Sequence, residues 1–277
     1  MGFQINTNLA AMNAYRNLSA NQASLSTSLE RLSSGLRINR AADDAAGLAI
    51  SESLRAQTNG LNQATSNAQD AISLIQTAEG GLNETHAILQ RMRQLTVQAG
   101  NDTNDAAART NITAEIAQLN TELDKIAGTT QFNGQQLLDG THNTVATAFS
   151  FQVGANSGET MAVQLGVKAD SAGLTTATVD VTTAINVTAS LTKIDAAITT
   201  VSGIRADLGA VQNRLQHRVN SLSVAAENTA AAESRIRDTD MAKEMTSFTR
   251  SQILQQAGVS MLAQANSAPQ SVLKLLG

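Results

Sequence analysis

Hydrophobic residues recur every seven positions through a long middle segment of the chain. The series is Leu54, Leu61, Ala68, Ile75, Leu82, Leu89 and Thr96, and three residues after its members come Gln57, Ala64, Ala71, Ala78, Thr85 and Met92. A heptad spacing places both series on one face of a helix that packs along a seam. At about 1.5 Å per residue, a helix of about 43 residues is on the order of 65 Å long. Only Gly60, Gly80 and Gly81 interrupt this predicted helix.

A second series with the same spacing lies in the C-terminal half. It comprises Ile194, Val201, Leu208, Leu215, Leu222, Thr229 and Ile236, with Ala197, Ile204, Val211, Ala225 and Ala232 beside it and one arginine, Arg218. A shorter helix is predicted from residue 112 to 126, and Gly128 is expected to end it. The two longer helices far exceed the mean of roughly 11–12 residues in globular domains. They predict a rod in which segments from opposite ends of the chain pair antiparallel.

Between these helices the pattern changes to that of strands. Apolar and other residues alternate in "AFSFQVG" and "TMAVQLGV", with the apolar positions at Phe149, Phe151, Val153, Met161, Val163, Leu165 and Val167. The turn-prone "GANSGE" joins the two segments, so a β-hairpin is predicted within about residues 131–170. The stretch that follows, to about residue 190, fits either a weak strand or an irregular loop. The predicted fold class is mainly α, a long antiparallel helical bundle or coiled-coil rod with one β-hairpin region and paired N- and C-terminal segments.

Both ends of the chain are nearly free of charge. Residues 1–15 contain no Asp, Glu, Lys or Arg, and residues 251–277 contain only Lys274. Chain termini are usually solvated and polar, so these ends are either loose tails or amphipathic helices that bury their apolar residues against partner chains. The residues expected to be buried in the second case are Ile5, Leu9, Met12, Leu18, Val259, Leu262, Val272, Leu273, Leu275 and Leu276.

The amino-acid composition limits which residues can form the core and which classes of partner the protein can bind. Aromatic residues make up 2% of the 277 residues, and there is no Trp and no Cys. The core must therefore consist of aliphatic side chains and alanine, and disulfides and thiolate metal sites are excluded. A net charge of −4 argues against nucleic acid, which favours a basic face. The chain contains no run of 18 apolar residues, so no membrane span is predicted. The N-terminus lacks the pattern of a cleavable signal peptide.

Candidate catalytic groups are few. The three histidines lie far apart in sequence, and no HExxH, GxSxG or phosphate-binding glycine loop is present. The pair Asp43–Asp44 and the run that ends at Asp240 lack the spacing of a calcium-binding loop. We therefore predict no catalytic residue, no metal site and no cofactor.

Several long motifs resemble those of bacterial flagellins. They are "INTNLAAMNAYRNL", "LERLSSGLRINRAADDAAGLAISESLRAQ", "QRMRQLTVQAGNDTN", "TQFNGQQLLDG", "FQVGAN", "AENTAAAESRIRDTDMAKEMT" and "AQANSAPQSVLKLLG". The resemblance covers about residues 1–170 and 190–277. The middle of the chain leaves no room for the extra outer domains of larger flagellins.

The resemblance implies that the chain is divided between layers of a helical filament. Residues 1–33 and 241–277 correspond to an inner domain of paired helices, which in flagellins is disordered in the free monomer and folds on assembly. Residues 34–46 correspond to a spoke and residues 47–240 to the rod domain, with variable outer domains absent or minimal at about 141–190. Uncharged ends fit this division, because each terminal helix alone lacks the apolar area that would offset its ordering entropy.

The spoke gives the charged, turn-like stretch "LSSGLRINRAADDAAGLAIS" a role. Gly35 is expected to permit a turn after the first helix, and Asp43 or Asp44 to cap the next one. Arg37 and Arg40 are expected to form charge pairs with the aspartates, within or between subunits. The alternative, a solvated linker without such a role, stays open.

The segment "QRMRQLTVQ" resembles the part of flagellin that the vertebrate Toll-like receptor 5 binds. The match places Gln90, Arg91, Leu95 and Gln98 on the long helix and Glu115 on the next one. Spacings of four and three put Arg91, Leu95 and Gln98 on one face. An exposed leucine between these polar residues is expected to act as a compact anchor.

Further partners and two alternatives follow from the resemblance. The partners are other copies of the chain in a helical homopolymer, the flagellar cap, hook-associated proteins, an export chaperone, the flagellar type III export apparatus, and host NAIP sensors. The expected location is the secreted, extracellular filament. A hook–filament junction protein shares the paired-end plan, but its family matches the spoke and receptor stretches less closely. An enzyme of the kind found in some flagellins needs a large insert with HExxH, and neither is present.

Overall fold

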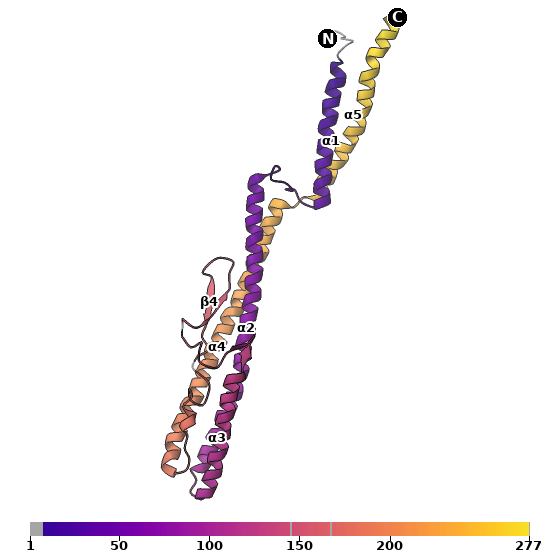
Figure 1. Ribbon diagram of the computed structural model, residues 1–277. Coiled ribbons are helices and arrows are strands. Elements are labelled where there is room, and N and C mark those ends of the chain that lie inside the picture. The colour runs from indigo at the N-terminus through magenta and orange to yellow at the C-terminus, as the bar shows by residue number, and fades with distance from the viewer. Residues whose placement is uncertain (1–7, 145, 167, 277) are drawn as a thin grey trace. The chain divides into compact units, whose positions relative to one another are not determined.

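Five long helices and two small hairpins make up the described part of the chain, so the predicted mainly α class is confirmed (Figure 1). The computed structural model describes residues 8–144, 146–166 and 168–276, and only the backbone of 184, 185 and 268–276. The helices are α1 (Leu9–Ser34), α2 (Ala45–Ala99), α3 (Ala106–Thr129), α4 (Ala184–Arg237) and α5 (Met241–Leu276). The chain forms two compact units, one of Gln57–Glu227 and one of Met1–Ala56 with Asn228–Gly277.

In the unit of Gln57–Glu227, α2 and α4 run antiparallel, as predicted. Arg93 of α2 forms an ion pair with Asp195 (2.7 Å), and Glu79, further toward the N-terminus, pairs with Arg205 (3.6 Å). The predicted heptad positions fill the interface and are buried: Leu61, Ala68, Ile75, Leu82, Leu89, Thr96, Ile194, Val201, Leu208, Leu215 and Leu222. A narrow seam of aliphatic and alanine side chains therefore replaces the aromatic core that this composition cannot supply.

The third helix, α3, packs on the flank of α2 and ends later than the sequence predicts. Gly128 was expected to stop it, but the helix runs to Thr129, and the N–H of Thr130 still donates to the carbonyl of Ile126 (3.0 Å). The side-chain amide of Gln136 donates to the carbonyl of Gly128 (3.0 Å). Because a side chain satisfies this terminal carbonyl, the helix needs no left-handed glycine there.

Two antiparallel hairpins follow α3. β1 (Gln131–Phe132) pairs with β2 (Gln135–Gln136), and β3 (Phe149–Gln152) pairs with β4 (Thr160–Val163). The second is the hairpin predicted from the alternating pattern. The stretch that fitted either a strand or a loop is a loop with one short helical turn, η1 (Thr176–Thr178), up to residue 183. Its last residues, from 184 on, are neither strand nor loop, because α4 begins there.

Arg218, the one arginine in the α4 series, serves the β3–β4 hairpin. Its Nε donates to the carbonyl of Val153 (2.8 Å), and from the other side Asn67 of α2 donates to the carbonyl of Gln152 (3.0 Å). Buried backbone carbonyls need such donors. A charged side chain of α4 and an amide side chain of α2 together thus hold the hairpin against both long helices.

Adjacent glycines in α2 give a matched test of this packing. A Cβ on Gly80 meets no described heavy atom within 4 Å, whereas one on Gly81 lies 2.7 Å from Oγ1 of Thr130 and 2.9 Å from Cδ1 of Leu138. We expect Gly80→Ala to raise the free energy of unfolding by about 0.5–1 kcal/mol, because alanine loses less backbone entropy. Gly81→Ala should lower it by about 1–3 kcal/mol through overpacking. Urea unfolding followed by circular dichroism measures both, and shifts of the same sign would contradict the packing described.

In the other unit, α1 and α5 pair antiparallel and bring the two ends of the sequence together, as predicted (Figure 1). The side-chain amide of Asn8 donates to the carbonyl of Ala265 (2.8 Å), and at the opposite end of the pair Arg31 lies 3.9 Å from Glu244. Among the described side chains of the two helices, only that of Ser28 is buried. The pair therefore covers little of its own apolar surface.

Candidate functional site

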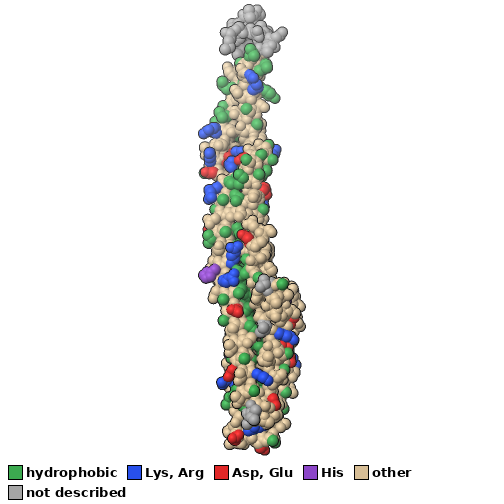
Figure 2. Space-filling view, turned by 90° about the vertical axis from the view of Figure 1, so that its left-hand side faces the viewer, with side chains coloured by type: hydrophobic (Ala, Val, Ile, Leu, Met, Phe, Trp, Pro, Cys, Tyr) green, Lys and Arg blue, Asp and Glu red, His purple; other side chains and the backbone are tan. Residues whose placement is uncertain are grey.

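Apolar side chains are exposed along the α1–α5 pair, and Figure 2 shows many of them on the surface next to the chain ends. Between 45% and 66% of their area is exposed for Leu9, Met12, Tyr15, Leu29, Met241, Met245, Ile253, Leu254, Val259 and Met261. So many exposed apolar side chains on one helix pair indicate an interaction site in a protein that is otherwise well packed. We call this set the terminal apolar face.

Shallow grooves on the pair are lined by this face. One lies on α5 and is lined by Met245, Ile253 and Leu254 together with two threonines and an arginine. Two others lie between α1 and α5 and share Tyr15, the single tyrosine of the chain. Grooves next to protruding apolar side chains are suited to receive another helix.

The residues predicted for terminal assembly fall into three groups. Leu9, Met12 and Val259 are exposed on the terminal apolar face, whereas Leu18 and Leu262 are half-buried. Ile5 lies outside the described residues, and so do the side chains of Val272, Leu273, Leu275 and Leu276. The prediction missed Tyr15, Leu29, Met241, Met245, Ile253, Leu254 and Met261, although apolar residues within predicted helices were a usable signal.

The chain leaves α1 through Gly35, which adopts the left-handed φ of +72° that the sequence predicts. Its N–H donates to the carbonyl of Arg31 (2.9 Å), and its carbonyl accepts from the N–H of Thr239 (2.9 Å). The N–H of Arg37 donates to the carbonyl of Arg237 (2.7 Å). Backbone hydrogen bonds therefore tie the segment after α1 to the segment before α5.

The two adjacent aspartates have separate roles. Oδ1 of Asp44 accepts from the N–H of Gly47 (2.8 Å) and caps α2. Oδ2 of Asp43 accepts from the N–H groups of Asn39 (3.1 Å) and Arg40 (2.9 Å), which closes the loop on itself. The structure thus assigns the predicted cap to Asp44 rather than to Asp43.

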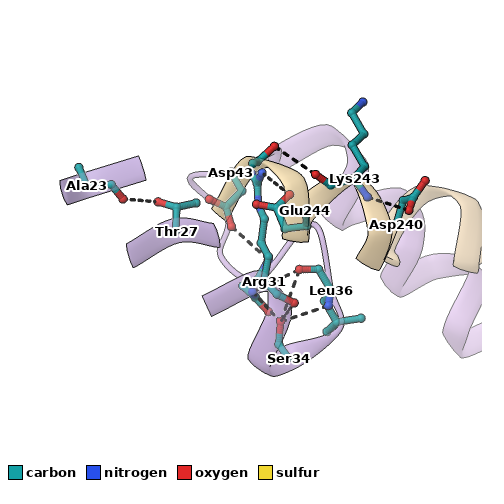
Figure 3. A network of polar contacts seen from close by, with 11 residues as sticks. Ala23, Thr27, Arg31, Ser34, Leu36, Asp43, Asp240, Lys243 and Glu244 are labelled. Carbon is teal, nitrogen blue, oxygen red and sulfur yellow. Dashed lines mark hydrogen bonds and ion pairs between the residues drawn. The ribbon is translucent and has the colours of Figure 1, made fainter. Parts of the chain in front are cut away.

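The expected charge pairs of Arg37 and Arg40 with these aspartates are wrong within the chain. Nε of Arg40 donates to Glu30 (2.9 Å), and the guanidinium of Arg37 donates to the carbonyl of Ile236. One oxygen of each aspartate instead accepts backbone N–H groups of its own segment. Figure 3 shows Arg31, which points between Asp43 and Glu244.

Sequence reasoning missed the residues that anchor this loop. Ile38 is completely buried, and a Cβ on Gly47 would lie 2.9 Å from its Cδ1. Arg237, half-buried, forms an ion pair with Glu52 (2.5 Å). An isoleucine within a charged stretch was a signal for the first, but no local pattern links residues 52 and 237.

Asp43 makes the loop sensitive to acid. Its pKa lies below the ordinary value of 3.8, because the N–H of Arg40, then that of Asn39, and to a smaller extent the charges of Arg31 and Arg40 stabilise the carboxylate. A carboxylate with a lowered pKa contributes stability above pH 3.8, and this contribution is lost as pH falls through its folded pKa. We expect the amide NMR shifts of Asn39 and Arg40 to titrate with a midpoint below pH 3.8. Asp43→Asn should remove that titration, and its persistence in the variant would assign it to another group.

The predicted receptor residues lie where α2 and α3 meet. Gln90, Arg91 and Gln98 are exposed on α2. Arg91 donates to Glu115 of α3 through Nε (3.0 Å) and Nη2 (2.7 Å). This ion pair brings residues of two helices, 24 positions apart, onto one surface.

The expected exposure of Leu95 is wrong. Its side chain is 2% exposed and belongs to the core, whereas Val97 of the same helix is 53% exposed. The heptad pattern assigns one buried seam to α2, but α3 covers a second flank, as the Arg91–Glu115 pair shows. Leu95 therefore supports the surface from below instead of protruding from it.

Asp240, considered as a candidate metal ligand, caps α5. Its Oδ1 accepts from the N–H groups of Ala242 (3.0 Å) and Lys243 (3.2 Å). Within the part of the chain that the structure describes, no three His, Cys, Asp or Glu side chains are grouped to hold a metal ion. None of the described helices is both long and apolar enough to cross a membrane.

Packed antiparallel helices, a closed core and an uncovered apolar face at the paired ends define a structural, self-associating class of protein. The bacterial flagellin N-terminal helical region matches residues 5–143, and the bacterial flagellin C-terminal helical region matches residues 191–276. The chain belongs to the bacterial flagellin family, whose members are structural proteins of the flagellar filament, and it is not an enzyme.

A related sequence matches almost the whole chain, and related solved structures match part of it. A flagellin of Halalkalibacterium halodurans is 54% identical over 274 residues, which are 98% of this chain and 99% of that protein. The crystal structure of Bacillus cereus flagellin is 36% identical, with a TM-score of 0.50 over 61% of this chain and 94% of that one. A structure described as a flagellar hook-associated protein from Vibrio parahaemolyticus reaches a TM-score of 0.60 over 71% of this chain and 100% of that one, at 16% identity. At that identity the likeness shows the fold alone.

Proposed function

We propose that this protein self-assembles into the helical filament of the bacterial flagellum and thereby serves motility. The terminal apolar face carries the proposal, because its side chains are 45–66% exposed in the single chain. Burial of such area against neighbouring copies supplies about 25 cal/mol per Å². Contacts between different faces of identical copies give an open helical polymer when the rotation from one copy to the next does not close into a ring.

The proposed layers follow the family division. Residues 1–33 and 241–277 form the inner layer, 34–46 the spoke and 47–240 the rod, with little or no variable outer domain at 141–190. In support, α1 ends at Ser34 and α5 begins at Met241. The two compact units of the single chain meet at other positions, within α2 and α4. The layers are therefore proposed for the assembled filament and not for the single chain. The poor burial within the α1–α5 pair supports ordering of this pair on assembly.

Seeded polymerisation tests this function. Purified intact monomer with sonicated filament seeds should give long filaments in negative-stain electron microscopy. Because Tyr15 is the single tyrosine and there is no Trp, intrinsic fluorescence reports on the terminal apolar face during growth. A chain without residues 1–33 and 241–277, checked for helical content, should not grow. Intact monomer that stops at short caps despite seeds would instead favour a hook–filament junction protein.

Export through the flagellar type III apparatus, with a chaperone for the C-terminal helix, is part of the proposal. The flagellar cap and hook-associated proteins are the proposed partners at the filament ends. NAIP sensors are the proposed host proteins that bind the C-terminal helix. A terminal pair with little buried apolar surface is inexpensive to unfold before transit. Secretion into the medium should require a working flagellar export apparatus, and equal secretion without it would remove this part of the proposal.

We also propose that monomers bind Toll-like receptor 5 through Gln90, Arg91, Gln98 and Glu115, with Leu95 beneath them. Arg91→Ala should lower potency on receptor-bearing reporter cells roughly tenfold or more, as loss of a central arginine does in interfaces. Arg93→Ala is the matched control, since Arg93 is equally exposed but pairs with Asp195 on α4. Equal losses for both variants, or no signal from intact monomer, would refute receptor binding at this surface.

A further inference from the structure

Asparagine is followed by glycine twice in this chain, at Asn59–Gly60 and Asn133–Gly134. The two pairs lie in different structural settings, one within α2 and one in the loop between β1 and β2. We propose that Asn133 is a site of spontaneous deamidation whose main product is isoaspartate, whereas Asn59 is protected by the fold.

The chemistry needs only water and the chain itself. The backbone nitrogen of Gly134 loses its proton and attacks Cγ of Asn133, and the side-chain nitrogen leaves as ammonia. The resulting succinimide ring is then opened by one water molecule at either carbonyl. Opening at one gives aspartate, and opening at the other gives isoaspartate, in which the main chain continues through the side-chain carbon. Glycine favours the attack because no Cβ shields its nitrogen.

The loop at Asn133 meets the requirements of this reaction. Its side chain is exposed, and the described hydrogen bonds include none from that side chain or from the N–H of Gly134. Asn133 has a φ of +50° and Gly134 a φ of +78°, as two-residue hairpin loops require. The attack needs a rotation of the Asn133 backbone. Strands of only two residues each make opening of this hairpin inexpensive.

Asn59 is exposed as well but lacks the freedom to react. The N–H of Gly60 lies inside α2, where it is committed to the helical hydrogen-bond ladder. A Cβ on Gly60 would be 3.0 Å from Cβ of Ala155, so this stretch of backbone is closely packed. Attack at Asn59 requires the middle of a long helix to open, which costs far more than opening a hairpin end.

Isoaspartate at residue 133 should loosen the segment that follows. Leu137 and Leu138 come directly after β2 and are 1% exposed, and the N–H of Leu137 donates to the carbonyl of Thr130 (3.0 Å). An added main-chain atom in the loop shifts the register that pairs Phe132 with Gln135. The modification therefore combines a new negative charge with a weaker hairpin.

Ageing of the intact protein tests the proposal. Samples kept at mildly alkaline pH and physiological temperature are digested with trypsin, which places residues 59 and 133 on different peptides, and analysed by fragmentation that separates aspartate from isoaspartate. In native protein the conversion at residue 133 should be roughly tenfold or more faster than at residue 59. In urea the two rates should converge. Equal or slower native conversion at residue 133, or aspartate as its main product, would overturn the proposal.

Two variants separate the effect of the new negative charge from the effect of the added main-chain atom. Asn133→Gly removes the reactive amide and tolerates the positive φ, so its Leu137 amide should keep its hydrogen-exchange rate on ageing. Asn133→Asp adds the charge without the added main-chain atom, and should leave exchange at Leu137 near the unaged rate. Faster exchange only in aged native protein supports the weakened hairpin. Equal acceleration in aged Asn133→Gly would assign the change to another site.

Discussion

Replacement of Ile253 by aspartate should abolish filament growth at concentrations where the intact monomer elongates seeds. Ile253 is 60% exposed in the single chain and lines the α5 groove with Met245 and Leu254. In the proposed filament this groove is covered by a neighbouring copy. An unpaired carboxylate buried there costs about 3–5 kcal/mol, which corresponds to roughly a 10²- to 10⁴-fold higher critical concentration.

The design separates assembly from folding. Because Ile253 is exposed, the substitution should leave the helical circular dichroism of the monomer unchanged. Ile253→Leu keeps the apolar area and should retain normal growth, measured by sedimentation of polymer and by Tyr15 fluorescence. Normal elongation of Ile253→Asp would show that this groove stays open to water in the filament. Loss of growth in Ile253→Leu would point to a fold defect.

Truncation of Leu89 to alanine should destabilise the unit of Gln57–Glu227 by about 2–5 kcal/mol. Leu89 is completely buried in the α2 seam, within the main core cluster. Removal of three side-chain carbons there loses transfer free energy and leaves a cavity that the rigid helices cannot close. For a unit of this size the thermal midpoint should fall by roughly 4–20 °C.

Val97 provides the control for that measurement. It lies on the same helix and is also aliphatic, but 53% of its side chain is exposed. Val97→Ala should change the free energy of unfolding by less than about 0.5 kcal/mol. Similar losses at both positions would mean that α2 is covered on the face of Val97 as well, contrary to the packing described.

Some features could not be predicted from the sequence because they depend on residues that are far apart along the chain. The burial of Leu95 follows from α3, which returns along a flank that the heptad pattern treats as solvent-facing. Gly128 remains helical because a glutamine eight positions later satisfies its carbonyl. Arg40 pairs with Glu30, ten positions earlier in α1, whereas Asp43 accepts backbone N–H groups of its own loop.

The sequence by itself determined the long helices, their antiparallel pairing, the hairpin and the uncharged ends, because heptad spacing, alternation and charge are local properties of the chain. Gly35 belongs with these, since a left-handed turn after a helix is recognisable from one residue type. Only the tertiary structure decided which side chains of each helix stay exposed. That depends on how many neighbours cover a helix: two long partners bury Leu95 within the rod, whereas a single partner leaves Ile253 uncovered on α5.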